Sequence, residues 1–475
     1  MDTKKLRQKI LDLAIRGKLV PQDPNDEPAS VLLERIRAEK ERLIAEGKIK
    51  RPRKSKTSAS PSHYQKLFQL PHNWEWIELG EFTYDLQYGT SEKSLSKGDV
   101  SVLRMGNLTQ IGTIDYSNLV YTCNKDDIAK FELQEGDLLF NRTNSSEWVG
   151  KTSLYDGKIP AIYAGYLIRI RAIVIDPNFL CMYMCSQYYR DWCLQVKTDA
   201  VNQSNINAQK LSKLYCPIPP LKEQRRIVSI FNNIIAILTQ IELSKSILIS
   251  TITGIKSKIL ELAVQGKLVP QDPTDEPAAD MLKRVNPKAK IITDNPHSWN
   301  IPETWCWCQL GDLFNHNTGK ALNSSKQDGQ EYEYITTSNV YWDRFELDSL
   351  KKMFYKDSEI DKCKVVKGDL LVCEGGDVGR SAIWNMDFPI MIQNHLHRLR
   401  PVSEGILASL YLYLFKLYKG KKLIGGKGIA LQGFSSNTLH KLVVPCIPKN
   451  EQKRIVAKID ELYSVLDKIE ASLQS

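Results

Sequence analysis

One thirteen-residue phrase occurs twice in the chain. GKLVPQDPNDEPA begins at Gly17, and GKLVPQDPTDEPA begins at Gly266, 249 positions later, with a single substitution between them. The match extends upstream, where KILDLAIRGKLVPQDP at Lys9 pairs with KILELAVQGKLVPQDP at Lys258 at the same offset. Self-similarity over such a length marks a repeated structural unit, and it limits the possible folds more strongly than any local propensity does.

A second series of matches runs through the rest of the chain at a shorter offset, between 228 and 232 positions. Five pairs belong to it: LPHNWEWIELGEF at Leu70 with IPETWCWCQLGDLF at Ile301, GDLLF at Gly136 with GDLLV at Gly368, VGKTSLY at Val149 with VGRSAIW at Val378, LIRIR at Leu167 with LHRLR at Leu396, and PIPPLKEQRRIV at Pro217 with PCIPKNEQKRIV at Pro445.

The two offsets explain each other. By the shorter offset the last residue, Ser475, corresponds to Ile247, and by the longer offset Met1 corresponds to Ser250. The C-terminus followed by the N-terminus therefore reproduces the middle of the chain. We infer two copies of one unit, arranged in circularly permuted order.

The middle of the chain predicts one long helix. Residues 222–265 lie between two prolines and Gly266, which are typical start and stop signals. Apolar residues recur there in alternating steps of four and three, a pattern typical of a coiled-coil seam. The predicted seam comprises Ile227, Phe231, Ile234, Leu238, Ile241 and Leu248, and its copy near the C-terminus comprises Ile455, Ile459, Leu462 and Leu466.

We expect the two helical rods to pair in antiparallel orientation. A rod over residues 222–265 is about 66 Å long, whereas a domain the size of residues 302–449 is roughly 40 Å across. That domain leaves the end of the first rod and enters the start of the second. A parallel pair would require it to bridge the whole rod, while an antiparallel pair places exit and entry side by side.

Two globular regions lie between the helical segments, and short runs such as DLLFN, LIRIRAIVI, DLLVC and LHRLR predict strands in them. The predicted fold class is α+β: two mixed α/β domains separated by a long antiparallel coiled-coil pair, pseudo-twofold and circularly permuted. The predicted divisions are an N-terminal helical region at 1–47, a basic linker at 48–63, a first globular domain at 64–220, a central long helix and repeated region at 221–285, a linker at 286–301, a second globular domain at 302–449 and a C-terminal coiled-coil helix at 450–475.

The formal charge of the chain is +10 at pH 7, which favours nucleic acid as a partner. More than half of this excess comes from KIKRPRKSK at 48–56, with six basic residues and no acidic one. The stretch is either a solvated linker or a strap that contacts phosphate. We find no apolar stretch of the roughly 18–20 residues that a membrane span needs. A cytoplasmic location without membrane contact is therefore expected.

The loops after the two GDLL motifs differ in length and chemistry. They read FNRTNSSEW in the first copy and VCEGGD in the second, although the flanking motifs match. Guanidinium, amide and carboxylate groups read base edges: Arg pairs with guanine, Asn with adenine, and Glu with the cytosine amino group. An ordinary polar hairpin is the alternative for each residue. The candidate DNA-binding residues are Arg104, Asn141, Arg142, Asn144, Lys151, Arg169, Glu374, Asp377, Arg380, Asn394 and Arg398.

Motifs for catalysis are missing from the sequence. VGKT at Val149 resembles the end of a phosphate-binding loop, but Ser145 stands where that motif requires glycine. We find no [DN]PP[YF] motif of an amino-methyltransferase and no convincing nucleophile or acid–base pair. His395 and His397 lack a carboxylate at metal-ligand spacing and are expected on a strand, one facing in and one out. We expect no catalytic residue, no metal and no cofactor in this chain.

The paired GDLL…VG[KR] motifs, the two EQ[KR]RIV helix starts, the LPxxWEW segment and the permuted duplication resemble the specificity subunit of a type I DNA restriction–modification system. The resemblance spans nearly the whole chain. It implies two target recognition domains, at 64–220 and 302–449, each reading one half of a bipartite double-stranded DNA site. It also implies helices that bind two copies of a separate adenine methyltransferase subunit, which brings S-adenosylmethionine, and a restriction–translocation subunit that joins them.

Two other functions compete with this interpretation. A coiled-coil scaffold for protein partners, without sequence-specific DNA binding, would share the helical spacer but has no need for duplicated polar loops. Salt-dependent binding to DNA in the presence of the methyltransferase separates these two functions. A self-contained nuclease or methyltransferase would need an active site that the sequence lacks.

Overall fold

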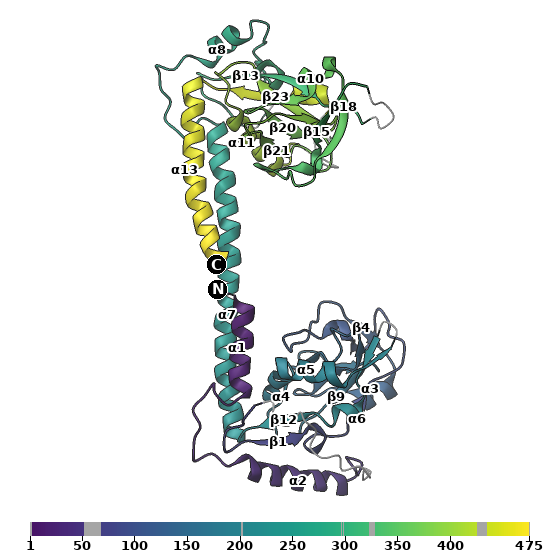
Figure 1. Cartoon of the computed structure of the whole chain (residues 1–475). Coiled ribbons are helices and arrows are strands. Elements are labelled where there is room, and N and C mark those ends of the chain that lie inside the picture. The colour runs from purple at the N-terminus through teal and green to yellow at the C-terminus, as the bar shows by residue number, and fades with distance from the viewer. Residues whose placement is uncertain are drawn as a thin grey trace. The chain divides into compact units, whose positions relative to one another are not determined.

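The computed structural model describes residues 2–51, 68–200, 203–295, 297, 299–322, 328–424 and 435–474. The chain forms two compact units, Met1–Ser244 and Lys245–Ser475, and the division between them falls inside the long helix α7 (Leu221–Val264) (Figure 1). Most of the predicted basic linker lies outside the described residues, so its role stays a prediction.

The first unit contains short strands between helices. Its helices are α1 (Thr3–Ile15), α2 (Ala29–Ala45), α3 (Lys125–Phe131), α4 (Pro177–Tyr183), α5 (Gln187–Val196), α6 (Ala208–Leu211) and the first half of α7, with 3₁₀ turns at Leu79–Glu81 and Met105–Asn107. Its strands are β1 (Glu75–Glu78), β2 (Gln87–Tyr88), β3 (Val100–Leu103), β4 (Val120–Thr122), β5 (Leu138–Asn141), β6 (Thr143–Asn144), β7 (Thr152–Leu154), β8 (Ala161–Tyr163), β9 (Leu167–Ile170), β10 (Thr198–Ala200), β11 (Gln203–Asn205) and β12 (Tyr215–Ile218).

The second unit begins in the second half of α7. Its further helices are α8 (Ala278–Val285), α9 (Leu310–Leu313), α10 (Asp357–Cys363), α11 (Ala408–Gly420), α12 (Ser436–His440) and α13 (Lys449–Gln474), with a 3₁₀ turn at Thr337–Asn339. Its strands are β13 (Cys306–Gln309), β14 (Phe314–Thr318), β15 (Gln330–Ile335), β16 (Val340–Tyr341), β17 (Arg344–Phe345), β18 (Lys351–Tyr355), β19 (Lys364–Val365), β20 (Leu370–Cys373), β21 (Ser381–Ile383), β22 (Ile390–Ile392), β23 (Leu396–Pro401) and β24 (Val443–Cys446).

The main sheets of the two units have the same topology. The order β2-β9-β5-β7 in the first unit matches β14-β23-β20-β21 in the second, and both sheets are antiparallel. A second sheet in each unit contains one parallel pair, β3 with β8 and β15 with β22. The central strands β5 and β20 are buried at every residue, which explains their apolar sequences up to Asn141 at the end of β5. The predicted duplication of an α+β unit is confirmed.

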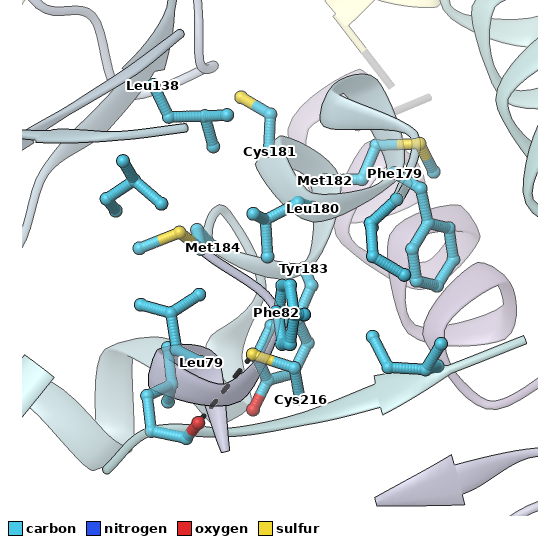
Figure 2. Packing of buried hydrophobic residues seen from close by; sticks show 14 of the residues in the cluster. Leu79, Phe82, Leu138, Phe179, Leu180, Cys181, Met182, Tyr183, Met184 and Cys216 are labelled. Atoms are coloured by element: carbon cyan, nitrogen blue, oxygen red, sulfur yellow. Dashed lines mark hydrogen bonds between the residues drawn. The ribbon is translucent and has the colours of Figure 1, made fainter. Parts of the chain in front are cut away.

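The core of the first unit lies between its main sheet and α4. Figure 2 shows the consecutive residues from Phe179 to Met184 packed together with Leu79, Phe82, Leu138 and Cys216. The thiol of Cys216 donates to the carbonyl of Leu214 and is fully buried. Cysteine acts here as a small apolar core residue, and burial raises the pKa of its thiol.

In each unit, one further helix lies antiparallel to its half of α7. In the first unit Thr3, at the start of α1, donates to Glu242, and Gln22, beyond the end of α1, donates to Glu223. In the second unit Lys256 pairs with Glu470, 2.9 Å away, near the end of α13, and Gln271, beyond the end of α7, donates to Glu451 near the start of α13. In both units the partner helix therefore runs against the direction of α7, as the antiparallel prediction requires.

The seam on α7 differs from the predicted one at its centre. Ile227 and Leu238 are buried as predicted, but Leu248 is 41% exposed, and its neighbour Ile249 is half-buried. Leu248 lies between Glu242, which contacts Thr3 at the start of α1, and Lys256, which contacts Glu470 near the end of α13. It is therefore exposed because it falls between the stretches of α7 that the two partner helices cover, and the prediction for Leu248 is wrong.

α7 also corrects the expectation about membrane length. Among the described residues, this one helix is long and apolar enough to pass a test for a membrane span based only on length and composition. Its apolar character has two sources, the seam and exposed residues such as Ile237, Leu243 and Ile247. A coiled-coil helix with both features passes the same test.

The repeated phrase closes the end of a helix against the globular domain. Gly17 and Gly266 both have a φ of 66°, a left-handed conformation that favours glycine. A Cβ atom on Gly17 would lie 2.4 Å from Cγ of Pro71, and one on Gly266 would lie 2.2 Å from Cγ of Pro302. The glycine is therefore required both by its backbone and by close approach, which accounts for its presence in both copies.

The same phrase also contacts a buried carboxylate at the start of the next long helix. Glu223 is 1% exposed and accepts hydrogen bonds from the Trp74 indole, at 3.1 Å, and from Gln22 of the phrase. One helical turn on, Arg226 forms an ion pair with Asp26 of the phrase at 2.6 Å. The second unit repeats this arrangement with Glu451, Trp305, Gln271, Arg454 and Asp275. We call each of these five-residue sets a junction.

The second unit holds a histidine pair that the first unit lacks. Nε2 of His316 on β14 lies 2.9 Å from Nδ1 of the buried His397 on β23. Burial, with the charges of His397 and His440, lowers the pKa of His316 to about 4. The pair of Asn317 with Arg398 corresponds to the pair of Gln87 with Arg169 in the first unit. One residue before each of these, His316 corresponds to Leu86 and His397 to Ile168.

This pair predicts an acid-dependent loss of stability. In the unfolded chain His316 is protonated below about pH 6.5, whereas in the folded chain it is protonated only below about pH 4. Between these values the unfolded state binds more protons, so the free energy of unfolding falls as the pH drops. We expect a loss on the order of 2 kcal/mol, reduced by partial exposure. The variant with His316→Leu and His397→Ile, which copies the first unit, should lose this component. Urea unfolding at pH 7 and pH 5 measures the difference, and equal pH dependence in both proteins would contradict the assignment.

Candidate nucleic-acid interface

Four chain segments meet at one end of the strands in the first unit. Backbone hydrogen bonds join them: Thr90 N to Tyr163 O at 2.9 Å, Gly165 N to Thr90 O at 2.6 Å, Ala164 N to Leu103 O at 3.0 Å, and Arg142 N to Tyr166 O at 3.1 Å. The segments are the end of β2, the end of β3, the end of β5 and the turn between β8 and β9. We call this meeting point the recognition frame.

The second unit contains the same frame. Its bonds run from Lys320 N to Ile392 O at 3.2 Å, Asn394 N to Lys320 O at 3.0 Å, Gln393 N to Ile335 O at 3.1 Å, and Glu374 N to His395 O at 3.0 Å. Each bond has its counterpart in the first unit, so the main chain has one conformation in two copies.

The predicted reading loops close in the same way. Asn141 N donates to Lys151 O at 2.9 Å, and Cys373 N donates to Arg380 O at 2.8 Å. Gly150 and Gly379 stand just before the closing residue, with φ of 85° and 84°. The loops differ in length, yet their ends are fixed identically.

Equivalent positions in the two frames carry different side chains. The pairs are Thr90 with Lys320, Arg104 with Thr336, Arg142 with Glu374, Lys151 with Arg380, Gly165 with Asn394, and Tyr166 with His395. The first frame therefore contains three cations, whereas the second contains a carboxylate and two cations, of which Lys320 is paired with Glu359. A shared main chain with different polar groups suits the recognition of two different base sequences.

Six of the eleven candidate residues lie in these frames: Arg104, Arg142, Lys151, Glu374, Arg380 and Asn394. Asn144 is the next one, on β6 beside the first frame, where its side chain contacts Met105. Arg169 lies within β9, opposite Gln87. Asp377 forms an ion pair with Lys419 at 2.7 Å.

Two candidates are buried. Asn141 is fully buried, and its amide nitrogen donates to Trp148 O at 3.4 Å. Arg398 is 4% exposed and donates to the carbonyls of Asp361 and Lys364, and burial lowers its pKa. Both side chains serve the interior of their sheets.

Residues that the sequence analysis did not name as DNA-binding candidates complete the frames: Thr90, Tyr166, Lys320, Thr336 and His395. Tyr166 and His395 directly precede the matched LIRIR and LHRLR motifs, so alignment of those motifs is the signal that would have found them. His395 is exposed and His397 is buried, as expected, but His395 lies just before β23 and the first four residues of β23 are all buried, so strand alternation is not the reason. A hairpin of β10 and β11, which extends β6 in the first unit, was also missed.

The first frame contains hydrogen-bond donors on the side chains of Arg104, Arg142 and Lys151. The Arg142 guanidinium lies over the Tyr88 ring at 4.8 Å, and the Lys151 ammonium lies over the Trp148 ring at 5.2 Å. Burial lowers the pKa of Lys151. Among the described residues, the Nε atoms of Arg104 and Arg142 are buried without a hydrogen-bond partner. Unpaired guanidinium donors of this kind are suited to an acceptor supplied by a ligand.

In the second frame, Arg380 donates to Thr337 O at 2.6 Å and lies over the Tyr341 ring at 5.1 Å. Glu374 Oε2 lies 3.8 Å from Nδ1 of His395. No group of three or more His, Cys, Asp or Glu side chains that would hold a metal ion occurs among the residues that the structure describes.

The type I restriction modification DNA specificity domain matches the chain at residues 71–250 and again at 302–475. The chain belongs to this family. It is 26% identical over 543 residues to the specificity subunit of the type I restriction enzyme EcoAI of Escherichia coli, which covers 98% of this chain and 90% of that one. It is 25% identical over 552 residues to the corresponding EcoEI subunit of the same organism, with 99% and 91% covered.

Solved structures agree on the fold of this specificity subunit. The HsdS subunit from Thermoanaerobacter tengcongensis aligns with a TM-score of 0.52 at 18% identity, covering 86% of this chain and 95% of that chain. A chain from work on assembly and conformational transition of the type I R-M system aligns with a TM-score of 0.57 at 17% identity, covering 86% and 94%. The two matched specificity domains each contain one recognition frame.

Proposed function

We propose that each recognition domain reads one half of a bipartite double-stranded DNA target through its recognition frame. The observation that carries this proposal is the identical main chain of the two frames with different polar side chains. Cations at Lys151 and Arg380 occupy matched positions and suit phosphate, a contact that positions without specifying sequence. Arg142 and Glu374 occupy another matched position, and their opposite hydrogen-bonding character suits different bases.

We further propose that the helices bind two adenine methyltransferase subunits, which supply S-adenosylmethionine, and that restriction–translocation subunits join this assembly in the cytoplasm. Exposed apolar side chains along α7 support a protein partner: Ile230, Ile237 and Leu243 in the first unit, and Ile247, Leu248 and Ile255 in the second. Large exposed apolar residues in a row are typical of interaction surfaces. In this proposal the chain itself is not catalytic.

The proposal that this chain recognises DNA while a separate subunit catalyses methylation has a direct test. The purified chain alone should neither methylate DNA nor bind S-adenosylmethionine, because no frame residue forms a nucleophile or a cofactor pocket. Addition of the methyltransferase should produce methylation at one defined sequence. Radioactive methyl transfer and calorimetric titration with S-adenosylmethionine measure both properties, and methyl transfer by the chain alone would refute the proposal.

Frame variants should separate phosphate contacts from base contacts. Lys151→Ala and Arg380→Ala should weaken binding to all sequences alike and lower the slope of log K against log salt by about 1. Arg142→Ala and Glu374→Ala should instead relax one half-site each, with a loss of roughly 1–3 kcal/mol of discrimination. Binding titrations over a salt series and methylation mapping distinguish these effects. An unchanged motif in the Arg142 and Glu374 variants would place the reading surface elsewhere.

A further inference from the structure

Arg142 and Glu374 occupy equivalent places in the two frames, and both have long, flexible side chains. Each follows the last residue of a central strand, β5 or β20. Each donates its backbone N–H to the equivalent turn of its own unit, at Tyr166 O or at His395 O. A flexible side chain loses rotamer freedom when it binds a base. A contact that fixes the side chain beforehand reduces this entropy cost and therefore increases the discrimination between right and wrong bases.

An aromatic ring from another segment of the sheet meets each of these two side chains. In the first frame the Tyr88 ring at the end of β2 lies 4.8 Å from Cζ of Arg142. In the second frame the His395 imidazole, just before β23, has Nδ1 at 3.8 Å from Oε2 of Glu374. The two rings are not at equivalent positions. Tyr88 pairs with Ile168 in the first unit, and the equivalent pair in the second unit is Thr318 with His397, so Thr318 and not His395 corresponds to Tyr88.

The rings themselves are anchored by the main chain. The Tyr88 hydroxyl accepts a hydrogen bond from Ala208 N at 3.0 Å, and Tyr88 pairs with Ile168 in the sheet. The carbonyl of His395 accepts from Glu374 N at 3.0 Å, and the next residue, Leu396, pairs with Cys373. The Tyr88 ring is therefore held in place before any ligand arrives, whereas His395 is fixed by its main chain and its exposed imidazole contacts Glu374.

The contacts leave the reading groups free. The contact of Arg142 with the Tyr88 ring uses the π face of the ring and takes up no N–H donor in a hydrogen bond, so these donors remain able to reach base acceptors. The contact of Glu374 with His395 involves Oε2, so Oε1 remains to accept from a base amino group.

We propose that Tyr88 and His395 are positioning residues that hold Arg142 and Glu374 for base recognition, one in each recognition domain. This inference rests on the proposed function of the frames. It assigns no base contact to either ring, and it predicts that each ring affects only the half-site of its own domain.

The test uses the full chain with its methyltransferase and a DNA library in which each position of the wild-type methylated motif is varied singly. Tyr88→Leu should lower the discrimination between right and wrong bases at one position of the first half-site by about 5- to 20-fold and leave the second half-site unchanged. His395→Ala should do the same at the second half-site only. The untouched half-site is an internal control for folding of the whole chain.

Conservative variants separate positioning from a structural role. Tyr88→Phe keeps the ring and removes only the bond to Ala208, and His395→Gln keeps a donor near Glu374; both should retain most of the discrimination. Unchanged discrimination in Tyr88→Leu and His395→Ala would overturn the inference. So would equal relaxation of both half-sites, or a Phe variant as relaxed as the Leu variant. If the wild-type assembly methylates no defined sequence, the proposed function itself fails. That result is distinguishable from the outcomes for the Tyr88 and His395 variants.

Discussion

A fragment of residues 29–285 should form an antiparallel homodimer and, with the methyltransferase, modify a palindrome built from the first half-site and its inverted repeat. The fragment keeps one recognition domain, all of α7 and one copy of the repeated phrase, and it lacks α1 and α13. Without these partner helices the apolar seam of α7 is open along its whole length. An open seam of this kind associates, and two identical chains close it with twofold symmetry.

The fragment contains the replacement for its missing helix. The end of α7 repeats the sequence of α1, and its residues are buried to the same degree: Ile259, Leu260 and Ala263 match Ile10, Leu11 and Ala14, each less than 8% exposed. In the dimer, Gln271 and Asp275 of one copy would complete the junction of the other, in place of Gln22 and Asp26. The fragment starts at Ala29 so that these residues have no competitor from its own chain.

The register of the two halves also agrees with a symmetric pair. Thr3, which corresponds to Ile252, lies beside Glu242. Glu470, which corresponds to Glu242, lies beside Lys256. The same stretches of α7 therefore face each other in both units, and a self-pair would be centred near Ile247. Two copies of Lys245 would come close to that centre and would weaken the pairing.

Sedimentation gives the stoichiometry of the fragment, and methylation mapping gives its motif. Leu238→Lys, at a seam residue that is 4% exposed, should yield a monomer. Ile237→Lys, at the adjacent residue that is 60% exposed, is the matched control and should leave the dimer intact. A wild-type fragment that stays monomeric, or a dimer that modifies a direct repeat, would contradict the antiparallel two-copy architecture.

Duplication made most of the fold predictable from the sequence. Matched motifs such as GDLL and VG[KR] marked equivalent strands and loop ends in both units, so Arg142 and Glu374 could be assigned to loops of one shared frame. Periodicity also gave the long helix and its antiparallel partners. It failed at Leu248, because periodicity does not show where a partner helix ends, and Leu248 lies between the contacts of α7 with α1 and with α13.

The rest of the site depends on tertiary contacts that the sequence does not display. Arg398 has the composition of a surface residue, yet β23 is buried on both faces and its guanidinium binds two carbonyls. Tyr88, on β2, and His395, just before β23, are separated from the reading loops in sequence. They approach Arg142 and Glu374 only through the pairing of β2 with β9 and of β20 with β23. Position in the frame, rather than residue type, decides which polar residues face a ligand.

The junctions should be among the most sensitive places in the molecule. Glu223 accepts from the Trp74 indole through one oxygen and from the Gln22 amide through the other. Glu223→Gln replaces one acceptor by an NH₂ group that faces a donor, so one buried donor is left without a partner. We expect a loss of roughly 1–3 kcal/mol in the free energy of unfolding. Glu223→Ala removes both acceptors and leaves a cavity, with an expected loss of about 3–5 kcal/mol.

The pH dependence gives these variants a second readout. Burial raises the pKa of Glu223, against the opposing hydrogen bonds from Trp74 and Gln22. The stability that this shift contributes is present at pH values below the unfolded pKa near 4.5 and is lost as the pH rises through the folded pKa. Glutamine does not titrate, so the deficit of Glu223→Gln should be largest in acid and smaller at neutral pH. Urea unfolding at pH 4.5 and pH 7 measures it.

Glu451→Gln is the matched variant, because Trp305 and Gln271 contact Glu451 as Trp74 and Gln22 contact Glu223, and burial raises its pKa in the same way. Similar deficits in the two variants are expected, since each junction ties a long helix to its recognition domain. Methylation should slow in both while the base preference of each half-site stays the same, because the frames lie away from the junctions. A change of less than about 0.5 kcal/mol in either variant, the size expected at an ordinary surface site, would show that the repeated phrase is not held by this carboxylate.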